Sequence, residues 1–475
     1  MTDAAADIPA DWPHPGAGLS IESHGIDAIP ESERYGRASS LFGVWAAANV
    51  NFLGFIIGTV LVLMGLSLWQ AMAVVLAGSL CSLFTGTVAG SGPAAGTPSE
   101  VITRTMYGVR GNRVNVALTG WLVSVCYLAL NWSAASYVGF SLVERAGLSA
   151  TTPVKVAVIV LIAAATLAIS VYGHGFIMRI YQPMALVLTA IFAVMIVYVV
   201  RGADWNYTPA THLGGTELWA TLAAAFALVA SGPLSYTNSA DFARYLPSAT
   251  PVAKVAFWTA LGCILPGLVV TGAGALAATA VDASDAQAAA EGLLPSWFAP
   301  IFLVAVIVAT IANNAMTAYS SGLALQSIGI RMRRSRTVVL DGIVGTAMTL
   351  FGLLVWNFLD SVSNAMQLIA AVLAPVMSIY VADMWLRRNR YDGVELGDQR
   401  PGSRFWYAGG VNPAGAIALV GGIALALLCS AAPVYTGPIA DAIGGIDISV
   451  PVGLVVPAAV YLLLMRTWVE REVTR

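Results

Sequence analysis

The amino-acid sequence predicts an all-α integral membrane protein with twelve transmembrane helices. Hydrophobic residues make up 58% of the 475-residue chain without the 46 glycines, and only 10% of the residues are charged. A soluble domain carries roughly 25% charged residues, because its surface has to be covered by polar groups. Long uncharged stretches, each near the roughly 20 residues that a helix needs to cross a bilayer, lead to the same fold class.

Twelve apolar stretches follow one another along the chain after a polar tail, residues 1–40. Each is long enough to cross a bilayer as a helix. The predicted spans cover residues 41–66, 70–96, 114–142, 153–172, 180–200, 216–240, 253–281, 297–328, 337–357, 362–386, 412–432 and 448–466.

Basic residues are concentrated on alternate connections between these spans. With the N-terminal tail in the cytoplasm, 20 of the 23 Lys and Arg residues lie on that side, and only Arg145, Lys155 and Arg201 lie on the other. Short loops rich in Lys and Arg stay in the cytoplasm when a membrane protein inserts. We therefore expect both termini in the cytoplasm, no cleavable signal peptide, and a location in the plasma (inner) membrane.

Several function classes receive no support from the sequence. The four cysteines lie in apolar stretches without metal-ligand spacing, and no histidine falls inside a predicted span. A membrane enzyme would need a metal cluster, a nucleophile–base pair or a phosphate-binding loop, and a channel would favour pore-lining rings. The net charge of −2 gives no indication of a nucleic-acid partner. We therefore expect neither an enzyme nor a resident cofactor or metal.

The first and the sixth predicted spans contain residues that interrupt a helix. In the first, Asn49 and Asn51 lie amid apolar sequence and are followed by Gly54 and Gly58. In the sixth, residues 231–235 (SGPLS) fall in mid-span, where proline removes a backbone donor and glycine permits unusual dihedrals. Two interrupted helices five spans apart are typical of inverted-repeat transporters with a site at the bilayer midplane. Each break alone is also compatible with close-packed glycines or an ordinary proline kink.

Short motifs along residues 22 to about 390 carry a resemblance to a known family. They read ESHGIDAIPESER at 22–34, LFGVWAAAN at 41–49, GPAAG at 92–96, YGVRG at 107–111, SADFARYLP at 239–247, IANN at 311–314 and AYSSGL at 318–323. In this order and spacing, the chain resembles the nucleobase:cation symporter-1 family, and specifically its purine–cytosine permease branch.

The resemblance implies a leucine-transporter-type fold, in which spans one to five and six to ten are inverted repeats and the last two helices are peripheral. The chain would then divide into a cytoplasmic tail (1–40), two five-helix repeats (41–200 and 201–390) and a C-terminal part with helices eleven and twelve (391–475). The resemblance also implies alternating-access uptake of a nucleobase or similar flat heterocycle, driven by Na+ or H+. The family's default is a monomer in the lipid bilayer.

Family members stack the planar ligand on an aromatic residue of span three, usually Trp, with Asn four residues later. The matching residues here are Tyr127 and Asn131, and an alignment shifted by one residue would place Cys126 at the stacking position. Stacking needs only a π-face, which Tyr supplies together with a polar hydroxyl. Alternatively, Tyr127 packs between helices without contacting the ligand.

Amides and backbone groups of three further spans complete the predicted substrate site. Asn313 and Asn314 match the span-eight amides of the family, and a carboxamide presents both the donor and the acceptor that a heterocycle edge requires. Adjacent residues point about 100° apart on a helix, so at most one of them faces the ligand. Either amide could instead form an interhelical hydrogen bond. The remaining candidates are Asn49 of span one and Ser231, Gly232, Ser235 and Tyr236 of span six.

The cation site of sodium-coupled relatives is only partly present. Those relatives place adjacent hydroxyl residues in span eight, beside carbonyl groups of the broken first helix. Here the hydroxyl positions read Ala312 and Asn313, the nearest hydroxyl is Thr310, and Ala46 and Asn49 would supply the groups of the first helix. Because hard cations prefer oxygen ligands, this departure favours proton coupling, as in the fungal branch, or no tight coupling.

A proton-coupled carrier needs a titratable group, and no predicted mid-span position holds one. The acidic residues near the cytoplasmic helix ends are Glu100, Asp241, Asp341 and Asp383. Salt bridges to Arg104, Arg244 or Arg387 would give these residues a structural role. Asp241 is the first candidate for coupling, because the moving segment of span six ends there.

Other substrates and one other function class stay open. Hydantoins, allantoin and the pyridine or pyrimidine vitamins are also flat nitrogen heterocycles, and Na+ is the alternative coupling ion. A membrane receptor that senses its ligand without net transport would share these sequence features. A flux assay separates such a receptor from a carrier.

Overall fold

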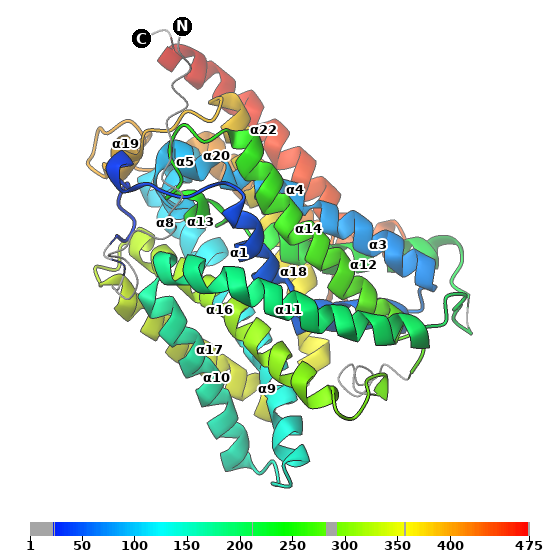
Figure 1. Cartoon of the computed structure of the whole chain (residues 1–475). Helices are drawn as coiled ribbons and strands as arrows, with labels where there is room; N and C mark the ends of the chain where they lie inside the picture. The colour runs from blue at the N-terminus through cyan, green and yellow to red at the C-terminus, as the bar shows by residue number, and fades with distance from the viewer. Residues whose placement is uncertain (1–21, 23, 211, 282–291, 356–357, 474–475) are drawn as a thin grey trace, which may run out of the picture.

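The computed structural model describes residues 22, 24–210, 212–281, 292–355 and 358–473. These residues form a bundle of long helices (Figure 1). Two short strands, β1 (Ala431–Ala432) and β2 (Tyr435–Thr436), pair antiparallel and form the only sheet in the described part of the chain. The chain is therefore all-α in architecture, as the composition predicts.

Many of the helices are short segments separated by breaks. The first half contains a 3-10 turn, η1 (Glu31–Glu33), then α1 (Ser40–Asn49), α2 (Phe52–Leu63), α3 (Leu68–Leu80), α4 (Ser82–Ala89), α5 (Ser91–Ala95), α6 (Ser99–Ile102), α7 (Arg104–Tyr107), α8 (Val109–Asn115), a π-helical segment η2 (Val116–Leu122), α9 (Val123–Arg145), α10 (Thr152–Tyr172) and α11 (His174–Gly202). The second half contains α12 (Gly215–Ser235), α13 (Ala240–Ala243), α14 (Val252–Ala277), α16 (Ala299–Ile328), α17 (Arg334–Val355), α18 (Phe358–Leu386), α19 (Gly393–Gly397), α20 (Pro413–Leu428), α21 (Pro438–Ala442) and α22 (Ser449–Val473).

Eleven of the twelve predicted spans have a counterpart of sufficient length. Within the described residues, 10 helices are long and apolar enough to cross a membrane, and the bent pair α1–α2 makes an eleventh span. The predicted span 412–432 corresponds to α20, which has only 16 residues, fewer than the roughly 20 that cross a bilayer. The membrane-spanning helical architecture is confirmed, whereas the count of twelve and the boundaries of the two repeats stay predictions.

Local sequence signals explain where several helices begin. Ser67 and Gln70 form a capping box at the start of α3, in which the side chain of each residue accepts a hydrogen bond from the backbone N–H of the other, at 3.4 and 2.9 Å. Asn412 caps α20 by accepting from the N–H of Ala414 at 3.1 Å, with Pro413 at the first helical position. These caps satisfy backbone groups that have no partner inside the helix.

Helices α2 and α14 pack backbone against backbone. A Cβ atom at Gly58 would collide with the carbonyl of Thr271, and a Cβ atom at Gly274 would collide with the carbonyl of Phe55. Small residues allow two membrane helices to approach this closely. At Gly54 the nearest atom, Thr271 Oγ1, would lie 3.4 Å from the added Cβ. Gly58 is therefore a close-packing residue, whereas Gly54 leaves ordinary space.

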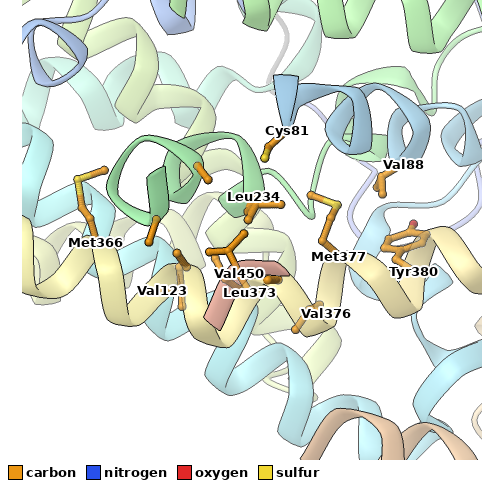
Figure 2. Packing of buried hydrophobic residues seen from close by; sticks show 14 of the residues in the cluster. Cys81, Val88, Val123, Leu234, Met366, Leu373, Val376, Met377, Tyr380 and Val450 are labelled. Carbon is orange, nitrogen blue, oxygen red and sulfur yellow. The ribbon is translucent and has the colours of Figure 1, made fainter. Parts of the chain in front are cut away.

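Helix α18 forms the floor of a large buried cluster. Figure 2 shows Leu373 and Met377 of α18 beside Leu234 of α12, with Tyr380 near Val88 of α4. Helix α18 also packs along α22, which contributes Val450 to the same cluster. The cluster fixes the end of α12 against α4 and α18, which places the interrupted sixth span in the interior of the bundle.

Segments far apart in the sequence meet at one end of the bundle, which we call the basic face. It is formed by residues 22, 24–39, 96–113, 244–251, 329–336 and 387–411 and carries the arginines of these segments. The backbone N–H of Ile29 donates to Gly96 at 2.9 Å, and that of Arg110 donates to Gly410 at 2.7 Å. Helix α22 ends at the same end of the molecule (Figure 1). The basic face gathers segments that the sequence assigns to the cytoplasm.

Candidate functional site

The first span is broken at Val50 and Asn51, as the sequence predicts. Helix α1 ends at Asn49, α2 begins at Phe52, and their axes differ by 55°. The Asn51 side chain accepts from the N–H of Gly54 at 3.0 Å and donates to the carbonyl of Ala48 at 3.0 Å. One amide thus satisfies a backbone group on each side of the break, which the interior of a membrane protein requires.

The sixth span breaks later than predicted. Helix α12 continues through residues 231–235, with Pro233 in its last turn, and the chain leaves helical geometry at Tyr236 before α13 begins at Ala240. Hydroxyl groups satisfy carbonyls in the last turn of this helix, where helix ends leave carbonyls without a backbone donor. Thr85 Oγ1 donates to the carbonyl of Pro233 at 2.8 Å, and Ser235 Oγ donates to that of Gly232 at 2.6 Å. The predicted break at 231–235 was therefore wrong by about one turn.

A cavity of about 110 Å³ lies between these two breaks and the π-helical segment η2. Its lining is rich in amides and hydroxyls and includes two tyrosines. The residues that line it are Asn49, Asn51, Leu53, Gly54, Ile57, Ser79, Ser82, Glu100, Thr119, Gly120, Val123, Ser124, Tyr127, Asn131, Val229, Gly232, Pro233, Ser235, Tyr236, Thr237, Asn238, Cys263, Gly267, Thr271, Asn313, Thr317 and Met366. Apolar walls with a few convergent polar groups are the usual form of a small-molecule site.

The aromatic candidates of spans three and six both line the cavity. Tyr127 donates its O–H to the carbonyl of Ser231 at 3.0 Å, which joins α9 to α12. Tyr236 donates to Asn49 Oδ1 at 3.4 Å, and its ring meets that of Trp45 edge-on at 4.8 Å between centroids. Cys126 is not among the residues that line the cavity. Of the two alternatives for the stacking position, the geometry therefore favours Tyr127.

A chain of amides connects spans three, eight and one beside the cavity. Asn131 Nδ2 donates to Asn313 Oδ1 at 3.1 Å, and Asn313 Nδ2 donates to the carbonyl of Ala48 at 2.7 Å. Asn314 points away and donates to the carbonyl of Leu128 at 3.0 Å. Asn131 and Asn313 therefore line the cavity, whereas Asn314 holds α16 against α9.

The remaining candidates divide into those on the cavity and those away from it. Gly232, Ser235 and Asn49 line it, whereas Ser231 does not, and its carbonyl instead accepts the O–H of Tyr127. Two cation candidates, Ala46 and Thr310, do not line it. The carbonyl of Ala46 accepts from the N–H of Val50 at 3.0 Å, and Thr310 Oγ1 donates to Val306 at 2.9 Å.

Two of the three predicted salt bridges are replaced by other contacts. Asp241 accepts from the N–H of Ser99 at 2.8 Å and from Ser320 Oγ at 2.6 Å, while Arg244 pairs with Glu22 at 2.9 Å. Arg104 donates to the carbonyl of Leu396 at 2.7 Å. Only the pair Asp383–Arg387 forms as predicted, at 2.9 Å. The replacements arise because the buried arginines reach carbonyls and the tail segment, which local sequence spacing does not reveal.

Asp341, the fourth acidic candidate, accepts a hydrogen bond from Trp121 Nε1 at 2.6 Å. This contact joins α17 to η2, the segment that contributes Thr119 and Gly120 to the cavity. Thr119 and Gly120 were not predicted from the sequence, and Glu100, predicted to lie near a helix end, lines the cavity as well. The π-helical turn that aims Thr119 and Gly120 inward has no sequence signal beyond the glycine, although such turns are frequent at functional sites.

Comparison with known proteins identifies the family. The model of the permeases for cytosine and purines, uracil, thiamine and allantoin matches residues 28–453. The chain belongs to this permease family. It is therefore a multi-pass membrane transporter of the nucleobase type and not an enzyme, and the family predicted from the sequence motifs is confirmed.

Two relatives of the permease align over nearly its whole length. YxlA of Bacillus subtilis, which is assigned to the purine–cytosine permeases, is 26% identical over 471 residues, with 96% of this chain and 98% of the relative covered. The purine–cytosine permease fcyB of Emericella nidulans is 26% identical over 483 residues and covers 94% of this chain and 89% of its own.

Solved structures share the fold of the permease. Mhp1, a nucleobase-cation-symport-1 family transporter in a closed conformation with bromovinylhydantoin bound, gives a TM-score of 0.77 at 19% identity, with 95% of this chain and 97% of Mhp1 covered. Inward-facing Mhp1 gives 0.71 at 20% identity, with 95% and 96% covered. A manganese transporter of Eremococcus coleocola gives 0.54 at 13% identity, with 96% and 99% covered. The helical arrangement is therefore that of the Mhp1 fold.

Proposed function

We propose that the permease imports a nucleobase of the cytosine or purine type by alternating access, with H+ as the coupling ion. The observation that carries this proposal is the cavity between the two broken spans, with Tyr127 and Tyr236 beside the amides of Asn49, Asn131 and Asn313. Aromatic faces bind the plane of a heterocycle, and carboxamides donate to and accept from its edge. Discontinuous helices at the site are the usual basis of alternating access.

Proton coupling is favoured by amide N–H donors that lie where sodium-coupled relatives would bind the cation. The carbonyl groups at the end of a helix carry partial negative charge, and a cation would bind there. In this permease, the side-chain amides of Asn51 and Asn313 both donate to the carbonyl of Ala48, and that of Asn49 donates to Trp45 at 2.9 Å. N–H donors thus meet the carbonyls at the end of α1, next to span-eight positions that hold Ala312 and Asn313 in place of hydroxyls.

Thermal stabilisation of the purified permease tests the substrate and the ion together. A compound that binds only the native state raises the free energy of unfolding by RT ln(1 + L/Kd), where L is the concentration of the compound. Cytosine, adenine and hypoxanthine would be compared with hydantoins, allantoin and heterocyclic vitamins, each with and without Na+ and at two pH values. A shift from a nucleobase that depends on pH and not on Na+ is expected. Stabilisation by another heterocycle alone would contradict the substrate class.

A second candidate function is uptake of a hydantoin, allantoin or a heterocyclic vitamin, coupled to Na+. It is favoured by the bromovinylhydantoin bound to Mhp1, which shares the fold. A receptor that binds without transport is the alternative class, and flux into proteoliposomes distinguishes it. We further propose a monomer in the plasma (inner) membrane. Both termini would lie in the cytoplasm, because the arginines of the basic face would then follow the positive-inside rule.

Substitution of Tyr127 should separate stacking from hydrogen bonding. We expect Tyr127→Ala to weaken nucleobase binding by about 1–3 kcal/mol, because the ring face is lost, which is roughly 5- to 150-fold in Kd. Tyr127→Phe keeps the face and loses only the bond to the carbonyl of Ser231, so its Kd should stay much closer to wild type. Equal losses in both variants, measured by isothermal titration, would contradict stacking on this ring.

Removal of the charge of Asp241 should uncouple transport from the proton gradient. We expect Asp241→Asn to abolish pH-driven accumulation of nucleobase in proteoliposomes while exchange continues, because the side chain keeps its size but loses its charge. Asp398→Asn, which alters a partly exposed carboxylate bound to Arg400 on the same face, is the matched control. Unchanged pH-driven uptake in Asp241→Asn would contradict a role in coupling.

A further inference from the structure

We propose that Glu100 is the group that carries the coupled proton, and that it does so as one half of a buried carboxyl pair with Asp241. This inference deepens the proposed function and rests on it. Glu100 lies in α6, between the second and third spans, and its side chain lines the wall of the cavity. The proton site would therefore lie between the substrate cavity and the basic face.

The surroundings of Glu100 favour the protonated, neutral form of its side chain. The residue is 5% exposed, and its Oε2 atom is buried without a hydrogen-bond partner among the residues that the structure describes. Its backbone carbonyl accepts from Asn112 Nδ2 at 2.7 Å and from Ser327 Oγ at 2.8 Å, which fixes α6 in place. A buried carboxylate oxygen that receives no hydrogen bond disfavours the charged form, so the carboxyl group takes up a proton instead.

Asp241 is the member of the pair that keeps the negative charge. It is fully buried, and its two oxygens accept separately from the N–H of Ser99 and from the hydroxyl of Ser320. Hydrogen bonds donated to a carboxylate stabilise its charged form. The two carboxyl groups are close enough for the charge of Asp241 to act on Glu100. One proton on Glu100 and one charge on Asp241 is therefore the favoured state.

The groups that face this pair from neighbouring elements support the same assignment. Burial raises the pKa of Glu100 well above its ordinary value of 4.5, and the charge of Asp241 raises it further, while Arg244 opposes the shift. From α18, the phenol of Tyr380 also faces both carboxyl groups. From α16, Tyr319 is near Asp241. The charge of Arg244 is balanced by its ion pair with Glu22. Arg244 therefore does not stabilise the charged form of Glu100 enough to remove its proton.

The location of the pair connects the proton to the conformational cycle. Asp241 lies on α13, directly after the break of the sixth span, and binds α6 through Ser99 and α16 through Ser320. With Glu100 protonated, the pair holds these elements together at the basic face. When that face opens, water reaches Glu100, its pKa falls towards the ordinary value, and the proton leaves to the cytoplasm. The remaining like charges then repel until a proton arrives from the other side.

A transport assay tests the coupling role of Glu100. In proteoliposomes, one proton per substrate and a gradient of one pH unit give about tenfold accumulation. The probe is radiolabelled cytosine, or adenine or hypoxanthine if that is the base that stabilises the protein. We expect the ratio of gradient-driven accumulation to exchange to fall about tenfold in Glu100→Gln. The control Glu144→Gln changes an exposed glutamate near the C-terminal end of α9. This variant should retain the wild-type ratio. Full accumulation in Glu100→Gln would overturn the proposal.

The pH dependence of stability tests the proton site without any substrate. A group whose pKa is raised by folding contributes stability below its unfolded pKa, and this contribution is lost as pH rises through the folded value. The wild type should therefore lose Tm as pH rises above about 4.5, and Glu100→Gln should flatten this part of the profile. Equal slopes in both proteins would overturn the proton site. If the wild type shows no pH-driven accumulation, the proposed coupling is wrong and Glu100 has no transport role, while the Tm profile still decides whether it binds a proton.

Discussion

Asn313→Ala should abolish transport, because it removes a side chain that serves the site and the broken helix together. The amide donates to the carbonyl of Ala48 at the end of α1 and accepts from Asn131. Its loss leaves the Asn131 donor without an acceptor in a buried environment, which costs about 1–3 kcal/mol. The cavity also loses a donor–acceptor pair for the heterocycle edge. Nucleobase binding by isothermal titration and Tm should both fall.

The adjacent amide provides the matched control. Asn314 donates to the carbonyl of Leu128 and does not line the cavity. We expect Asn314→Ala to lower Tm by a similar amount, since it also breaks one buried hydrogen bond, but to leave the Kd for the nucleobase nearly unchanged. The opposite pattern, with binding lost only in Asn314→Ala, would show that the helix presents its other face to the ligand.

Glu22→Gln should open the basic face. The carboxylate of Glu22, 7% exposed, meets Arg244 at 2.9 Å and Arg334 at 3.6 Å, and it accepts from the phenols of Tyr245 and Tyr319. Burial alone would raise its pKa, but the charges of Arg244 and Arg334, together with the contacts of His174, outweigh burial and lower it. Removal of one partner from a buried ion pair costs about 3–5 kcal/mol. If only the closed conformation loses about 3 kcal/mol, the ratio of the open to the closed conformation rises by on the order of a hundredfold.

A native thiol reports this opening. Cys263 lines the cavity and is 2% exposed, so a maleimide supplied from the basic face should reach it only when that face opens. We expect mass spectrometry to show much faster labelling of Cys263 in Glu22→Gln than in wild type. Glu33→Gln is the matched control, because Glu33 lies on the same segment but pairs with His24 at the surface. Equal labelling in all three proteins would mean that the Glu22 network does not hold the face closed.

The two interrupted spans show how far local sequence determines the structure. The break at Asn51 was predictable, because the same residue caps α2 and closes α1 within a few positions of itself. The end of the sixth span was not, because the carbonyl near Pro233 is satisfied by Thr85 of a different span. A proline marks where a helix loses a donor, but only the tertiary neighbours decide whether the helix ends there.

The residues of the site also divide into those that local sequence predicts and those that only the tertiary structure reveals. Tyr127, Asn131 and Asn313 were predictable, because each lies within a long helix whose family motif fixes its position. Glu100 was not, because its sequence neighbours place it at a helix end, where pairing with an arginine is the usual explanation. Its burial depends on contacts from α8, α13 and α16, which are brought together only by the fold.

The contact between α2 and α14 limits which parts of the permease can move independently. Gly58 and Gly274 each lie against a carbonyl of the opposite helix, so neither helix can rotate or slide without separating the two backbones. A Cβ atom at Gly262 of α14 would likewise collide with the carbonyl of Phe42 in α1, so α14 is packed closely against both halves of the broken first span. The three helices must therefore move as one body. Asn51 at the break lines the cavity, so any force that a bound heterocycle exerts there is transmitted along all three helices at once.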